Sequence, residues 1–206
     1  MLQVESARIL NQNKWTNDDM DVFNRLPKEY QSFLYKTNGG YVKPETAIFK
    51  IQIERMFNGI TYSENTQRIN EFWSFISYKN EKPEKNKPAS ILHEHFDRHV
   101  SEHFLPDGII CIGLCDQNSL FAISINENDF GAIYYWEWYW RYPWYKDFFT
   151  KRIRQVELAF PDFNEIVSNE KHPKFRELDN QLNYATIVKV SGSFDSFTSS
   201  LVDENL

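Results

Sequence analysis

Residues 108–144 read GIICIGLCDQNSLFAISINENDFGAIYYWEWYWRYPW, and the rest of the chain is organised around this stretch. It contains three apolar runs, 109–115, 120–125 and 132 onward, separated by polar segments rich in Asp, Asn, Ser and Gly. Short apolar runs bounded by such turn residues are typical of β-strands joined by hairpins. The stretch therefore predicts an antiparallel meander of three strands, with helices and turns built around it.

The third strand of this meander continues into an aromatic run. Because side chains alternate across a strand, one face carries Tyr134, Trp136, Trp138 and Trp140, and the other carries Tyr135, Glu137, Tyr139 and Arg141. We expect Trp136 to be part of the core, since residues of a central strand usually pack. The aromatic side chains from 138 to 144 are either core or contact surface, because so many are hard to bury together where a strand leaves its sheet.

Composition excludes several classes of function. The chain has 206 residues, of which 25% are charged and 41% hydrophobic, and most simply forms one domain over 1–206. Its net charge of −6 disfavours binding to nucleic acid, which requires a basic patch. No apolar run is long enough to span a membrane, and the first residues do not resemble a signal peptide. We expect a cytoplasmic protein that binds neither nucleic acid nor membrane.

The two cysteines, Cys111 and Cys115, lie four residues apart on one predicted strand. Their Cα atoms should be about 13 Å apart at the usual rise per residue, which is too far for a disulfide. We expect both to be reduced and buried.

Upstream of the meander, hydrophobic spacing and turn residues predict four elements. They are a helix over 16–26 capped by Thr16, a second helix from Pro27 that ends at Asn38-Gly39-Gly40, a strand over 46–54, and a helix over 66–78 with Ile69, Phe72, Trp73 and Ile76 on one stripe. Downstream, the same signals predict a helix or strand over 147–158, a short helix over 161–167, a strand over 185–190, and a final helix capped by Ser191-Gly192-Ser193.

A predicted helix over 90–105 carries a row of histidines, His95, His99 and His103. Two histidines four residues apart can bind one metal ion, but a third on the same straight helix lies too far along the axis. The sequence also has no HExxH motif, the pattern in which two helical histidines and a glutamate form a metal site. We expect a solvated or partly packed helix face, with a metal site as the less favoured alternative.

Three separated segments share a pattern: LPKEYQSFLYKTNGG at 26–40, Gly113 followed by GAIYYW at 131–136, and SFDSF at 193–197. Together they resemble the SUKH superfamily, which groups yeast regulators of cell-wall synthesis with bacterial immunity proteins of polymorphic toxin systems. The matching positions are Leu26, Pro27, Tyr30, Asn38, Gly39, Gly40, Gly113, Tyr135, Trp136, Phe194 and Phe197. Residues 144–184 look inserted relative to this pattern. If the last segment is matched wrongly, residues 160–167 correspond to the final helix of the family instead.

The resemblance implies an α+β fold, with an antiparallel sheet that includes the meander and is flanked by helices. It also implies no catalysis, no cofactor, and the binding and neutralisation of a cognate toxin domain, often a nuclease. Between 106 and 140 the acidic residues are Asp107, Asp116, Glu127, Asp129 and Glu137, without any Lys or Arg. An acidic surface edged by aromatic anchors suits a basic partner. We expect the partner to contact Asp116, Glu127, Asp129, Glu137, Trp138, Trp140 and Trp144.

Two other classes of function remain alternatives. One is a generic intracellular protein-binding or scaffold module on the same fold, and the other is a sugar-binding protein or a metal-dependent enzyme. The enzyme is disfavoured because the sequence offers neither a nucleophile with its base nor a phosphate-binding loop. The sequence leaves the oligomeric state and the identity of the toxin open.

Overall fold

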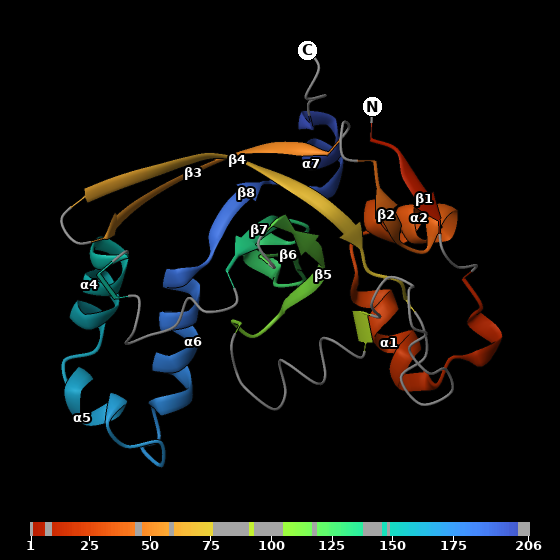
Figure 1. Ribbon diagram of the computed structural model, residues 1–206. Helices are drawn as coiled ribbons and strands as arrows, with labels where there is room; N and C mark the ends of the chain where they lie inside the picture. The colour runs from red at the N-terminus through yellow and green to blue at the C-terminus, as the bar shows by residue number, and fades with distance from the viewer. Residues whose placement is uncertain are drawn as a thin grey trace.

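The computed structural model describes residues 2–6, 10–43, 47–57, 60–75, 91–92, 105–116, 119–137, 146–147 and 149–201 (Figure 1). The strands are β1 (Val4–Ser6), β2 (Gly40–Val42), β3 (Ile48–Phe57), β4 (Ile60–Phe72), β5 (Ile109–Cys115), β6 (Leu120–Ser124), β7 (Ile133–Trp136) and β8 (Val188–Ser191). The helices are α1 (Asn17–Arg25), α2 (Lys28–Thr37), α4 (Thr150–Ala159), α5 (Phe163–Val167), α6 (Phe175–Thr186) and α7 (Phe194–Ser200), with short 3-10 turns at Gln12–Lys14 and Glu127–Asp129.

The strands form one open antiparallel sheet, which confirms the predicted α+β class. Its order is β1-β2-β4-β5-β6-β7-β8, and β3 pairs with the first part of the long strand β4. The predicted meander is confirmed as β5, β6 and β7, with Cys111 opposite Ala122 and Phe121 opposite Tyr135. Both cysteines are buried and are not joined in a disulfide, as expected.

Both faces of the meander are covered. On one face, Phe121 of β6 packs against Phe72 of β4, at 5.0 Å between ring centroids, and against Phe197 of α7 at 5.9 Å. Tyr135 lies on this face and contacts the ring of Phe49. On the opposite face, Tyr134 lines a groove formed with α4 and α6. The aromatic face of β7 is therefore core over its described residues, and Trp136 is 2% exposed, as predicted.

Local capping interactions set the start of α1 and the end of α2. The Thr16 hydroxyl accepts a hydrogen bond from the amide of Asp19, whose carboxylate accepts one from the amide of Thr16, so that a capping box starts α1. Asn38 ends α2 in the left-handed conformation with φ of 44°. Its side-chain oxygen accepts a 2.7 Å hydrogen bond from the amide of Phe75. The predicted C-cap thus also ties α2 to the chain beyond β4.

The helix predicted over 66–78 is wrong, because residues up to Phe72 belong to strand β4. The strand has a register irregularity between Ile69 and Glu71, where it pairs with β5. A bulge lets two consecutive residues turn toward the interior, and both Glu71 and Phe72 are buried. The irregularity breaks the alternation and leaves the buried residues at a spacing that imitates a helix.

The C-terminal third contains three helices before the last strand. The segment predicted as a helix or strand is helix α4, and the short helix predicted over 161–167 is confirmed as α5. Helix α6 was not predicted, and it includes Ala185 and Thr186, so the predicted strand over 185–190 begins only at Val188. The Ser193 hydroxyl accepts a hydrogen bond from the amide of Ser196 and caps α7, as expected. Helices α4 and α6 lie side by side below β8 in Figure 1.

Candidate partner-binding site

The antiparallel meander separates the predicted acidic residues into two groups. Asp116 follows β5 and Glu137 follows β7, so both lie at one end of the meander. Glu127 and Asp129 lie in the turn between β6 and β7, at the opposite end. Strand β6 has five residues, so the two ends are about 16 Å apart. The predicted residues do not form one acidic surface.

The end with Asp116 offers little acidic surface among its described residues. Glu137 is 1% exposed, and it accepts a hydrogen bond of 3.3 Å from the hydroxyl of Tyr135. The same hydroxyl oxygen also lies 2.8 Å from the hydroxyl of Ser119, within hydrogen-bond distance. Its burial removes Glu137 from any surface that a partner could touch. Asp116 is half-buried beside Cys115, whose thiol pKa is raised by burial first and by the charge of Asp116 second.

Several predicted residues lie outside the described part of the chain. They are the tryptophans of the predicted contact surface, Trp138, Trp140 and Trp144, and the histidine row His95, His99 and His103. The roles of both groups stay predictions.

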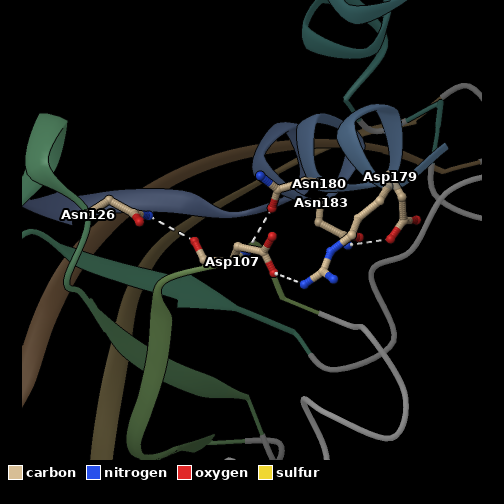
Figure 2. Close-up of polar contacts among 6 residues, drawn as sticks. Asp107, Asn126, Asp179, Asn180 and Asn183 are labelled. Carbon is tan, nitrogen blue, oxygen red and sulfur yellow. Dashed lines mark hydrogen bonds and ion pairs between the residues drawn. The ribbon is translucent and has the colours of Figure 1, made fainter. Parts of the chain in front are cut away.

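The other end, which we call the meander tip, comprises Asp107–Gly108 and the turn 126–131. Figure 2 shows Asp107 held between Asn126 of the turn and Asn180 of helix α6. The amide of Asp107 donates to the side-chain oxygen of Asn180 at 2.7 Å, and its carbonyl accepts from the side-chain nitrogen of Asn126 at 2.9 Å. The same nitrogen donates to the hydroxyl of Tyr184. Two turns and a helix are thus joined through one asparagine.

Gly108 makes this arrangement possible. Its φ is +75°, and a Cβ there would overlap the side chain of Asn126. A residue other than glycine would meet both backbone strain and a steric clash. Gly131, at the other end of the turn, also has a positive φ and faces the ring of Pro27, which joins α1 to α2. The tip therefore lies close to the α1–α2 junction on one side and is held to α6 on the other.

Asp129 is held inside the tip by two hydroxyls. Its carboxylate accepts hydrogen bonds from Ser124 and from Tyr134. The pKa of Tyr134 is raised, first by burial and then by its hydrogen bond to Asp129. The pKa of Tyr184 is also raised, by burial and by the charge of Asp129. Because both donors to Asp129 are neutral, they fix the carboxylate without cancelling its charge.

The outward side of the tip combines charge with an apolar side chain. Glu127 is exposed, and no cation within the described ranges pairs with it. Phe130 is 53% exposed, which is unusual for a phenylalanine in a rigid turn. Asp107 lies 3.5 Å from Arg176, but both side chains are well exposed, so this pair contributes little. The tip therefore presents a preorganised acidic surface around one aromatic side chain.

Sequence reasoning placed Glu127 and Asp129 at this site but missed the residues that complete it. Phe130 carried a signal, because it is an apolar residue alone among Asn, Asp and Gly. Asn180 and Tyr184 come from α6, which was not predicted. Their role depends on contacts across more than fifty residues of chain, and no local pattern signals such contacts.

The described residues hold no group of His, Cys, Asp or Glu side chains that could bind a metal ion. Among the same residues, none of the helices has the length and apolar character needed to cross a membrane.

Comparisons with known proteins find one family. The model of the SMI1/KNR4 family (SUKH-1) matches residues 21–169. No match is found among curated proteins or among solved structures. The matched range includes the second half of α1, all of α2, the meander and the tip, and it ends before α6, β8 and α7. The chain thus belongs to the SMI1/KNR4 family (SUKH-1).

Proposed function

We propose that this protein is an immunity protein, which binds a cognate toxin domain in the cytoplasm and blocks its activity without catalysis of its own. Membership of a family in which toxin immunity is common supports this proposal. The observation that carries it is the meander tip, where Glu127, Asp129 and Phe130 lie on one rigid turn. The surface that would contact the toxin is this tip, and the tryptophans from 138 to 144 are candidates to extend it.

The chemistry of the tip fits a basic partner, such as the active site of a nuclease. Nucleases hold phosphate groups with cationic side chains, so an acidic surface can occupy the same groups and accelerate association. An aromatic side chain surrounded by polar groups is typical of residues that dominate binding energy. Because the tip is fixed by hydrogen bonds before it binds, little conformational entropy is lost on association.

We also propose that the chain is a single domain, with residues 144–184 as an insertion in the family pattern. Leu178 and Leu182 of α6 and Ile153 of α4 belong to the same cluster of buried apolar side chains as the meander. Asn180 and Tyr184 of α6 contact the tip directly. The insertion thus supports the proposed binding surface as well as the core.

Co-expression tests this function directly. The neighbouring gene that encodes the toxin domain is expressed in a bacterial host with and without this protein, and growth is followed. We expect the toxin alone to arrest growth and the pair to restore it, with the two proteins purifying as a complex. Growth arrest that persists in the presence of folded immunity protein, together with the absence of a complex, would contradict the proposal.

A further inference from the structure

A groove of about 740 Å³ lies between helices α4 and α6 and is closed on one side by strands β7 and β8. Its lining residues come mostly from the segment that looks inserted. In Figure 1 the two helices descend from the sheet next to each other, and β8 continues directly from α6. A volume of roughly 300–1,000 Å³ is usual for sites that bind small molecules. Nothing in the proposed toxin contact uses the interior of this groove.

The charge of the groove is opposite to that of the chain. Its lining contains three cationic residues, Arg152, Lys174 and Lys189, and one acidic residue, Glu177. The chain as a whole has a net charge of −6. Within the part of the chain that the structure describes, none of the three cations forms an ion pair with a carboxylate. Unpaired like charges around one concave surface repel each other and attract an anion.

One of these cations is held in place before any ligand binds. The guanidinium of Arg152 donates a 2.6 Å hydrogen bond to the carbonyl of Ile187 and lies 5.8 Å from the ring centroid of Phe149. Lys189 lies opposite Tyr134 in the β7–β8 register, so its side chain and the tyrosine line the same wall. Planar, preorganised guanidinium groups suit carboxylate and phosphate oxygens particularly well.

The floor of the groove is apolar. Val156 is half-buried and Ala159 is exposed, so these two side chains supply accessible apolar surface, and the already buried Phe160, Ala185 and Ile187 complete the lining. A purely ionic ligand would leave this apolar surface in contact with water. A ligand with an apolar body and an anionic end would cover the floor and also reach the cations.

We propose that the α4–α6 groove binds a small amphipathic organic anion, with its carboxylate, sulfonate or phosphate near Arg152, Lys174 and Lys189 and its apolar part against Val156 and Ala159. This site is separate from the proposed toxin contact, and the proposal of a ligand here does not depend on the immunity function. The size of the groove favours a small molecule over a protein segment, because the space is bounded by α4, α6 and the sheet edge.

Fluorescence titration with anilinonaphthalenesulfonate, which joins an apolar ring system to a sulfonate, tests the proposal on the full chain. We expect saturable binding of one probe molecule. Lys174→Glu combined with Lys189→Glu should weaken the affinity by about tenfold or more, since two attractive charges become repulsive. The matched control combines Lys151→Glu with Lys171→Glu, which changes the net charge equally at exposed lysines outside the groove. The control should bind the probe like the natural chain, and circular dichroism should show both variants folded.

Competition identifies the class of ligand. Decanoate should displace the probe, whereas inorganic phosphate at the same concentration and ionic strength should not, because it cannot cover the apolar floor. Displacement by pentaglutamate at lower concentrations than decanoate would indicate an acidic protein segment and overturn the proposal. Non-saturable binding, or equal affinity in the two double variants, would overturn it as well.

Discussion

The meander tip and the α4–α6 groove adjoin each other, but they carry charges of opposite sign. In the tip, Asp129 is negative and is fixed by hydrogen bonds from Ser124 and Tyr134. In the groove, Lys174 and Lys189 are positive, and no carboxylate of the described chain pairs with them. The tip is a rigid surface that is complete by itself. The groove is a concave surface whose charges lack a counterpart.

Tyr134 belongs to both regions, because its hydroxyl binds Asp129 while the residue lines the groove. The two regions show how the groups that stabilise the fold can be distinct from the groups that bind a ligand. Removing a group from the tip breaks contacts that the fold uses. Removing the lysine charge of Lys174 or Lys189 from the groove takes away only a charge that repels its neighbours. The following predictions test this distinction, in order of decreasing effect on the free energy of unfolding.

Gly108→Ala should have the largest effect. The substitution forces alanine into a positive φ and against the side chain of Asn126, and we expect a loss of about 3 kcal/mol in the free energy of unfolding. Urea denaturation measures the loss. In an Asn126→Ala background the overlap with the amide is absent, so the additional loss from Gly108→Ala should be smaller. Fully additive losses would show that the two residues are not coupled.

Tyr134→Phe should have an intermediate effect, which depends on pH. At neutral pH the variant loses a hydrogen bond to a carboxylate, which is worth about 1.5–3 kcal/mol. The pKa of Tyr134 is raised in the folded protein, so above pH ~10 the unfolded chain releases this proton first. The free energy of unfolding of the natural chain therefore falls as pH rises through that range. The variant has no hydroxyl at position 134, so its free energy of unfolding does not fall for this reason. The stability difference between them should narrow above pH ~10, and a difference that stays constant would contradict the assignment.

Lys189→Ala should have the smallest effect. The side chain is exposed and forms no ion pair with a described residue, so the free energy of unfolding should change by less than about 0.5 kcal/mol. At low salt the change should be neutral or stabilising, because one of three repelling cations is gone. Thermal denaturation at two salt concentrations measures it. A loss comparable to that of Tyr134→Phe would show that the groove, like the tip, is part of the structural framework.

The parts of the fold that could be predicted depend on local signals. The Thr16 cap, the Asn38 end of α2 and the polar turns of the meander each act over a few residues, and all are present in the structure. Strand β4 was mistaken for a helix because its pairing with β3 and β5 is non-local. Its bulge also allows Ile69 and Phe72, three residues apart as on one side of a helix, both to be buried. No pattern within the strand itself distinguishes the two alternatives.

In the candidate site, too, features with a local signal could be predicted and features that depend on non-local contacts could not. The acids of the β6–β7 turn could be identified from sequence, since a polar turn between two strands is exposed by default. The burial of Glu137 could not, because it depends on the packing of a strand end beside Ser119 and Tyr135. The anchoring of the tip by Asn180 required the position of α6. Helix α6 did carry a signal, since Leu178, Leu182 and Ala185 recur at helical spacing.

Calorimetry with the purified toxin domain tests whether the meander tip binds the toxin. Glu127→Lys combined with Phe130→Ala is compared with a matched control, Glu165→Lys combined with Leu158→Ala, which changes an exposed acid and an exposed apolar residue on α5 and α4. We predict that the tip variant binds about a hundredfold more weakly, or about 2.7 kcal/mol, while the control binds like the natural chain. Equal affinities of the two variants would contradict the claim.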